Sequence, residues 1–222
     1  MDWTALRLSL QIGVTGAVFA ALLGIPLAWW LSRRRSWTRD AISTAALIPM
    51  VLPPTVLGYY LLQVVGRNSL IGSALDAAFG FSFVFDWSGA ALAAFLVSAP
   101  FLVRTAQAGF EAVDPNLEDA ARTLGRSELS LFLTVTLPVA WRSVMAGVAL
   151  ALARAIGEFG ATLMIAGSIP GRTRTMPIAI YEAVQTGQAT EAQALAATLT
   201  LSALGLLAAV GLLARGRGLL WR

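Results

Sequence analysis

The chain contains no lysine, no histidine and no cysteine, and these absences exclude most kinds of catalytic chemistry. Without lysine there is no phosphate-loop GxxxxGK[ST] motif, so any ATP must be hydrolysed by another protein. Without histidine or cysteine there is no Ser-His-Asp or Cys-His nucleophile, no zinc site of the usual ligands and no disulfide. The composition therefore favours a transport or binding role over an enzyme, and it predicts no metal site.

Charged residues are scarce. They make up 13% of the 222 residues, whereas soluble proteins average about 25%. Hydrophobic residues make up 57%, and the mean hydropathy is +0.73, so the chain has more apolar surface than water tolerates. All sixteen basic residues are arginine and are scattered at the ends of apolar runs. Because they form no single basic face, the net charge of +4 does not indicate nucleic acid binding.

Five segments are predicted to cross a lipid bilayer as helices. A crossing helix needs about 20 mostly apolar residues, and it must be helical because unpaired backbone groups are too costly in lipid. The fourth segment in chain order, 139–166, differs from the others because it carries Arg142, Arg154 and Glu158. The sequence therefore predicts one all-α, polytopic membrane domain over residues 1–222, with spans at about 8–31, 41–65, 88–110, 139–166 and 192–214.

The arginines predict the orientation of these spans. Loop 32–40, the stretch 111–142 and the residues after 214 are rich in arginine, whereas loops 66–87 and 167–191 hold only Arg67, Arg172 and Arg174. Arginine-rich connections stay in the cytoplasm. We therefore expect the N-terminal end to be periplasmic and the C-terminal end to be cytoplasmic.

Three shorter features are less regular. Residues 128–138 are apolar but too short to span, and we expect them to lie along the inner interface and to end at Pro138. The aromatic residues that alternate over 79–87 predict an extended interfacial anchor or, less favoured, a short strand. Kinks are expected at prolines in the first two spans, whether for motion or for packing: Pro26, Pro49, Pro53 and Pro54.

The long inner segment carries a motif, EDAARTLGRSELSLFLTVTLP. Its triplet Asp119-Ala120-Ala121 is followed after three residues by Gly125, and after nine more by Val135-x-Leu137-Pro138. In this spacing it resembles the EAA loop of ABC importer permeases, with Asp119 in place of Glu and Val135 in place of Ile. Gly125 can adopt the positive φ that ends a short helix. The alternative is an ordinary surface helix with a glycine C-cap.

The resemblance implies an architecture and a set of partners. The family's fold is that of type I importers, in which a homodimer meets two cytoplasmic ATPase subunits through a coupling helix, here within about 111–138. ATP and Mg²⁺ would be bound by the ATPase subunits and no cofactor by this chain. The residues implied to couple to the ATPase are Glu118, Asp119, Ala120, Ala121, Arg122, Leu124 and Gly125.

A second signature concerns the cargo. Gly157-Glu158-Phe159-Gly160-Ala161-Thr162, followed by Ile169-Pro170-Gly171 and Thr173-Arg174-Thr175, resembles the molybdate-uptake permeases of the bacterial inner membrane. The resemblance implies import of molybdate delivered by a periplasmic molybdate-binding protein. Sulfate permeases share part of this signature, so sulfate, thiosulfate and tungstate remain alternatives. An ion-coupled secondary transporter is disfavoured, because no internal repeat is visible and the EAA spacing is present.

Arg154 and Glu158 stand four residues apart and are expected to pair, since an unpaired charge in a span costs several kcal/mol. With Gly157, Gly160 and Thr162 they are candidates for the translocation path or its gate. A structural pair that fastens neighbouring helices is an equal alternative. Persistent anion binding by Glu158 is excluded, because a carboxylate repels a dianion. In the outer loop, Arg172 and Arg174 are candidates for attracting an anion or docking a binding protein, or are simply solvated.

Overall fold

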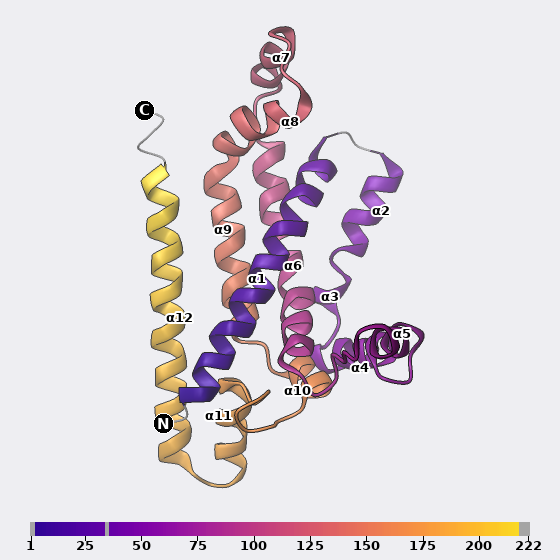
Figure 1. Cartoon of the computed structure of the whole chain (residues 1–222). Coiled ribbons are helices and arrows are strands. Elements are labelled where there is room, and N and C mark those ends of the chain that lie inside the picture. Colours follow the sequence, from indigo (N-terminus) through magenta and orange to yellow (C-terminus); the bar gives the residue numbers. More distant parts are fainter. Residues whose placement is uncertain (1–2, 34–35, 218–222) are drawn as a thin grey trace.

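The computed structural model describes residues 3–33 and 36–217, which form helices joined by short loops. Figure 1 shows long helices running side by side, with shorter helices at both ends. The predicted all-α fold is confirmed. In chain order the helices are α1 (Trp3–Ser32), α2 (Trp37–Ala45), α3 (Ile48–Val51), α4 (Pro54–Val65), α5 (Leu70–Phe79), α6 (Trp87–Glu111), α7 (Pro115–Thr123), α8 (Glu128–Leu131), the π-helical turn η1 (Phe132–Thr136), α9 (Leu137–Ile156), α10 (Gly160–Ala166), α11 (Met176–Gln185) and α12 (Ala189–Arg217).

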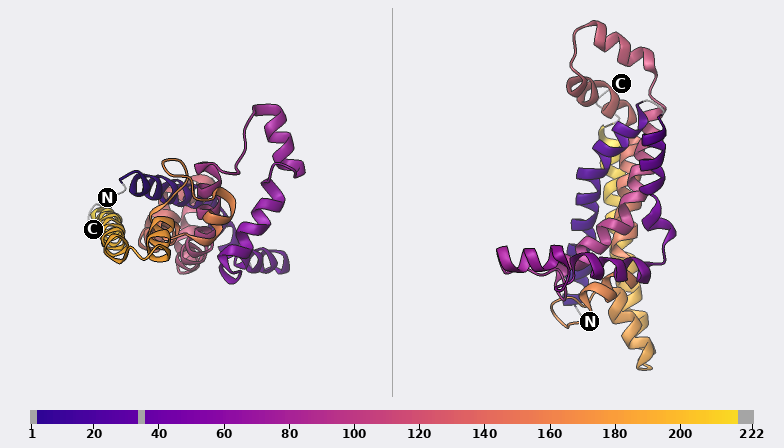
Figure 2. Two further views of the ribbon diagram at one scale, coloured as in Figure 1. Left: turned by 90° about the horizontal axis from the view of Figure 1, so that it is seen from below. Right: turned by 90° about the vertical axis from the view of Figure 1, so that its right-hand side faces the viewer.

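Four helical stretches in the described part of the chain are long and apolar enough to cross a membrane: α1, α6, the run Glu128–Ile156 and α12. A fifth crossing exists if the bent pair formed by α2–α3 and α4 counts as one. The helix α7 lies beyond one end of the long helices, and α4, α5, α10 and α11 lie at the other end (Figures 1 and 2). The two ends of the molecule are therefore built from different short helices.

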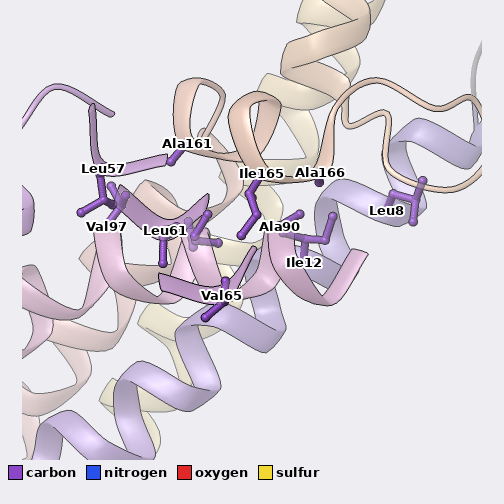
Figure 3. Packing of buried hydrophobic residues seen from close by; sticks show 13 residues of the cluster. Leu8, Ile12, Leu57, Leu61, Val65, Ala90, Val97, Ala161, Ile165 and Ala166 are labelled. Atoms are coloured by element: carbon purple, nitrogen blue, oxygen red, sulfur yellow. The ribbon is translucent and has the colours of Figure 1, made fainter. Parts of the chain in front are cut away.

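The core is formed by α1, α6 and α9, and small side chains allow these helices to approach closely. On α6, Ala90, Ala93 and Ala94 are fully buried. In a membrane the packing of small residues replaces the hydrophobic effect as the main source of helix association. Figure 3 shows Leu8 and Ile12 of α1 in one buried cluster with residues of α4, α6 and α10.

Helix α12 lies at the edge of this core and presents leucine side chains outward. These are Leu201, Leu204, Leu212 and Leu213, each more than half exposed. A helix that is apolar on an unburied face suits contact with lipid.

The second span differs from the expectation of one kinked helix over 41–65. The helices α2–α3 and α4 meet at an angle of 111°, so α4 does not continue across the membrane in the direction of α2. Leu52 and Pro53 are extended, with ψ of 138° and 136°, because each precedes a proline. The prolines thus produce a break with a sharp turn rather than a modest kink.

The fourth span in chain order, predicted over 139–166, also differs from the expectation. It ends at Ile156 instead of continuing to 166, and α10 is a separate short helix. At its other end, residues 128–138 do not lie apart as an interfacial segment but join α9 through η1. A π-helical turn just before Pro138 lets the helix continue, because it relieves the clash of the proline ring with the preceding turn.

The loops contain more helix than the sequence predicts. The loop 66–87 forms α5, and the segment 80–86 that follows it is neither helix nor strand, so the strand alternative is wrong. The loop 167–191 contains α11, and the last long helix starts at Ala189 rather than 192. Among the arginines used for orientation, Arg34, Arg35 and Arg222, together with the side chains of Arg215 and Arg217, lie outside the described residues.

Candidate functional site

The segment predicted to couple to an ATPase folds as α7, a helix with well-formed ends. Asp114 caps its start, where the carboxylate accepts a hydrogen bond from the backbone N–H of Asn116 at 2.9 Å. At its end, Gly125 has φ of +78°, and the N–H of Arg126 donates to the carbonyl of Ala121 at 3.2 Å. This is the Schellman arrangement. Glycine therefore ends the helix as the sequence predicts, because any side chain at this φ would be strained.

The inner face of α7 is tied to two transmembrane helices through one carboxylate. Glu118 has a side chain only 12% exposed, and it forms an ion pair with Arg33 at the end of α1. Its Oε1 accepts a hydrogen bond from the hydroxyl of Thr136 in η1 at 2.6 Å. Arg33 also lies over the ring of Trp29, 4.7 Å from its centroid. Through Glu118, a displacement of α7 acts directly on α1 and on the start of α9.

Arg122 is the centre of the charge cluster on α7. Its guanidinium donates to Glu128 at 2.7 Å and to Asp119 at 2.8 Å. The hydrogen bond to Glu128, followed by that to Asp119, raises the pKa of Arg122 above its ordinary value, so its charge persists at physiological pH. The side chain is 37% exposed, so solvent screens these pairs and their main effect is to orient α7 against α8.

The outer face of α7 carries an apolar stripe formed by Leu117, Ala120 and Leu124, which we call the α7 stripe. These residues stand at i, i+3 and i+7 and are all exposed, Leu124 to 83%. An exposed apolar stripe on a short helix is typical of helices that dock into a groove of a partner protein. No contact within the described chain accounts for it.

The seven residues predicted for coupling therefore divide between two faces. Glu118 and Ala121 point into the chain, and Arg122 is engaged with its neighbours. The other four are exposed: Asp119, Ala120, Leu124 and Gly125. Ala120 is thus exposed on the face that carries the α7 stripe, whereas Ala121 is 8% exposed and packs inward.

The predicted charge pair lies at the break between α9 and α10. The Nη1 of Arg154 is 2.8 Å from the Oε2 of Glu158, whose side chain is only 1% exposed. The other oxygen of Glu158 accepts a hydrogen bond from the backbone N–H of Ala161 at 2.7 Å and so caps the start of α10. The pair is confirmed, and it straddles the end of a helix instead of lying on one continuous helical face.

The break between α9 and α10 packs directly on the proline break before α4. A Cβ on Gly160 would lie 3.1 Å from Cβ of Pro54. One turn further, a Cβ on Gly58 would lie 2.7 Å from Cβ of Met164 and 2.9 Å from Cα of Ala161. The structure thereby brings the second sequence signature, which contains Gly160, against the proline break of the second span, and Thr162 of α10 is buried.

Replacement of Gly58 by alanine tests the close packing of α4 on α10. The added methyl group would meet the backbone of Ala161, so overpacking should cost about 1–3 kcal/mol. Gly211→Ala on α12 is the matched control, because a Cβ there meets nothing within 4 Å while the gain in helix propensity is the same. We expect Gly58→Ala to lower the unfolding temperature in detergent and Gly211→Ala to leave it unchanged or raise it; equal effects would contradict the close crossing.

The two outer-loop arginines are both paired. The Nη2 of Arg172 lies 3.7 Å from the Oδ2 of Asp86, and its side chain is 62% exposed. The Nη1 of Arg174 donates to the Oε2 of Glu182 at 3.4 Å. Their charges are therefore partly neutralised locally. Within residues 3–33 and 36–217, no group of His, Cys, Asp or Glu side chains is arranged to hold a metal ion.

Two residues that hold α7 in place are not predicted from the sequence. Arg33 belongs to a loop of four arginines that indicates only the orientation, and Thr136 lies in the apolar LTVTLP segment. Neither carries a local signal, because their shared partner Glu118 is 85 residues from Arg33 and 18 residues from Thr136. Only the tertiary arrangement makes them a site.

Comparison with known proteins identifies the family. Residues 20–215 match the family described as "Binding-protein-dependent transport system inner membrane component". The molybdenum transport system permease protein of Escherichia coli K12 is 43% identical over 185 residues, which cover 83% of this chain and 81% of that protein. The putative molybdenum transport system permease protein of Bacillus subtilis 168 is 39% identical over 192 residues, covering 86% and 85%.

Solved structures share the fold at low sequence identity. A chain of the MetNI methionine ABC transporter in an inward-facing conformation has a TM-score of 0.75 at 16% identity and covers 96% of this chain and 94% of that one. A chain of a bacterial ABC transporter that imports alginate has a TM-score of 0.77 at 15% identity, covering 96% and 78%. The arrangement of helices is thus that of ABC importer permeases. Family match and relatives together show that the chain belongs to the inner membrane components of binding-protein-dependent transport systems.

Proposed function

We propose that the chain is the membrane-spanning permease subunit through which an ATP-driven importer carries molybdate into the cell. The observation that carries this proposal is the 43% identity to a molybdenum transport permease over 83% of the chain. As a transport component it is not itself an enzyme, and ATP binds to a separate ATPase subunit. Sulfate, thiosulfate and tungstate are the competing cargoes.

The proposed orientation places α7 in the cytoplasm. Five arginines belong to this end of the long helices: Arg33 follows α1, Arg122 lies in α7, and Arg126 precedes α8. Arg39 and Arg142 lie near the starts of α2 and α9. Arginine near the ends of spans favours the cytoplasmic side. The start of α1 then lies on the periplasmic side and the end of α12 on the cytoplasmic side of the bacterial inner membrane.

The proposed assembly is a homodimer with two ATPase subunits and a periplasmic molybdate-binding protein. In it, the α7 stripe enters a groove of the ATPase, flanked by Asp119 and Gly125. Its apolar side chains stabilise the contact, because each buried leucine contributes about 1.5–3 kcal/mol. Arg172 and Arg174, on the opposite end of the molecule, face the binding protein.

Movement of the ATPases would reach the outer end of the permease through a continuous series of contacts. Glu118 joins α7 to α1 and to η1, and η1 continues into α9. The helix α9 ends at the Arg154–Glu158 pair, and α10 then packs on α4. A π-helical turn is a frequent position for a hinge. We place the outer gate at this crossing, with Arg154, Gly157, Glu158, Gly160 and Thr162 as its residues.

Glu158 acts in this mechanism as a clamp rather than as a ligand. Its two oxygens are occupied by Arg154 and by the N–H of Ala161, and it is almost fully buried. A carboxylate would also repel the anion. The two states of the transporter then differ in the packing of α10 on α4. Cargo or ATP shifts the equilibrium between these states only by binding one of them more tightly.

Uptake into proteoliposomes tests the proposed function. The chain is reconstituted with its ATPase and binding protein, and accumulation of radioactive molybdate is followed with and without internal ATP. We expect uptake that requires ATP and the binding protein and that resists a hundredfold excess of sulfate or thiosulfate. Uptake of sulfate in preference to molybdate would show that sulfate is the cargo. Uptake without the ATPase would refute the proposal that the chain belongs to an ATP-driven importer.

Substitution of Gly125 tests the shape of the docking helix. In Gly125→Val the left-handed conformation costs about 1–2 kcal/mol, so the end of α7 should rearrange. We expect the variant to insert normally but to retain less than a tenth of the ATPase during purification. Gly187→Val is the matched control, because Gly187 has φ of +73° at the opposite end of the molecule. Normal ATPase retention and uptake in Gly125→Val would contradict the docking role.

A further inference from the structure

A cavity opens beside the C-terminal end of α4, at the end of the molecule opposite α7. Its volume is about 370 Å³. Here α4 and α5 lie across the ends of the long helices (Figures 1 and 2). The residues that line it are Tyr59, Leu62, Gln63, Gly66, Arg67, Asn68, Ser69 and Val84.

Hydrogen-bond donors are concentrated along one side of this cavity. Tyr59 and Gln63 stand four residues apart on one face of α4, and Arg67 follows two residues after the last residue of this helix, Val65. The amide of Gln63 donates to the hydroxyl oxygen of Tyr59 at 2.8 Å, which leaves the hydroxyl hydrogen available to a ligand. All three side chains are exposed, as is that of Asn68. A polar face of this kind on a membrane helix is unsuited to lipid and faces water or protein.

Arg67 supplies the charge of this cavity. Its Nε donates a long hydrogen bond of 3.4 Å to the hydroxyl of Ser82, and in the described part of the chain it forms no ion pair. The outer-loop arginines Arg172 and Arg174, in contrast, each lie beside a carboxylate. Arg67 therefore has no carboxylate within ion-pair distance among the described residues, and it keeps most of its donors.

Carboxylates distinguish this cavity from the two at the α7 end. The residues known to line the outer cavity include no Asp or Glu. The cavities of about 560 and 670 Å³ beside α7 are lined by several, among them Glu111, Glu118 and Asp40. Of these three cavities, only the outer one is lined, among the described residues, by an arginine and by no carboxylate. Such a lining favours an anion.

We propose that this cavity is an outer anion site for a tetrahedral oxyanion dianion. Arg67 is the charged anchor, and Asn68, Gln63 and Tyr59 supply further hydrogen bonds to the anion's oxygens. The proposal rests on the proposed function and adds a place where the anion is held before it passes the crossing of α4 and α10. The opposite face of α4, with Leu57 and Leu61, packs in the cluster that includes α10, so anion binding and the gate share one helix.

Tungstate binding to the assembled transporter tests this site. The chain and an ATPase variant that binds but does not hydrolyse ATP are placed in nanodiscs of zwitterionic lipid, without binding protein, and titrated calorimetrically with tungstate. We expect binding that Arg67→Gln weakens at least about tenfold, since a hydrogen-bonded charge contributes on this scale. Arg67→Lys should retain part of the affinity, because it retains the charge.

Control measurements distinguish an anion site at Arg67 from a general charge effect and from a lipid site. Arg7→Gln removes a charge at the start of α1, at the same end of the molecule but outside the residues that line this cavity, and should leave tungstate affinity unchanged. No tungstate binding by the unsubstituted complex, or equal affinity in Arg67→Gln, overturns the site. Phospholipid that co-purifies only when Arg67 is present, without tungstate binding, would assign the cavity to a lipid phosphate and also overturns it. Molybdate uptake by the unsubstituted transporter is measured separately, so failure of the site does not imply failure of the proposed function.

Discussion

Replacing Arg154 with glutamine is expected to destabilise the permease more than replacing Arg154 and Glu158 together. The single substitution leaves a carboxylate that is 1% exposed without its cation. Breaking a buried ion pair on one side costs about 3–5 kcal/mol, whereas removing both charges is far less costly. For a chain of this size 1 kcal/mol corresponds to about 2–4 °C, so the unfolding temperature should fall by roughly 10 °C in the single variant.

The double variant is informative because it preserves the cap of α10. In Glu158→Gln the side-chain carbonyl can still accept the hydrogen bond from Ala161, which the carboxylate accepts at 2.7 Å. The comparison therefore isolates the charge. Unfolding temperature in detergent and accumulation in the membrane are the measurements. Equal damage in the single and double variants would show that Arg154 does not neutralise Glu158.

Leu124→Asp is expected to prevent association with the ATPase while leaving the permease folded. Leu124 is 83% exposed, so its replacement disturbs no contact within the chain. In a docked complex, however, a carboxylate would enter an apolar groove. A central anchor residue of an interface contributes at least about 2 kcal/mol, which corresponds to a loss of affinity of about 30-fold or more.

Leu124→Met is the matched control, since methionine keeps the apolar character of the α7 stripe and adapts its shape. We expect Leu124→Met to retain the ATPase and molybdate uptake, and Leu124→Asp to lose both at unchanged membrane content. ATPase affinity is measured with purified components in nanodiscs. Full ATPase binding by Leu124→Asp would exclude the stripe as the docking surface.

The spans and the coupling segment can be located from the sequence because their signals are local. Long apolar runs predict α1, α6 and α12 directly, and the spacing from Asp119 to Pro138 predicts a helix that ends at Gly125. These features depend on residues within one segment. Contact with lipid decides that the long apolar runs are helical, and the positive φ of one glycine decides where α7 ends.

The break in the second span can be located from the sequence, whereas the break in the span predicted over 139–166 cannot. Prolines at 53 and 54 indicate where α3 ends, but the 111° turn of α4 follows from its packing on α10 across Gly58. The end of α9 at Ile156 is not predicted, because the separate start of α10 depends on the side chain of Glu158, which accepts a hydrogen bond from Ala161, and on the packing of α10 against α4. Packing between segments about a hundred residues apart is not encoded in periodicity.

The most direct test of ATPase docking through α7 is the accessibility of position 124 from each side of the membrane. The chain has no cysteine, so Leu124→Cys introduces a unique thiol that a membrane-impermeant maleimide can label. We expect no labelling in intact spheroplasts, strong labelling in inside-out vesicles stripped of ATPase, and protection when the ATPase is added back. Labelling from the periplasmic side, or labelling that bound ATPase does not reduce, would contradict the proposal that α7 connects the permease to its motor.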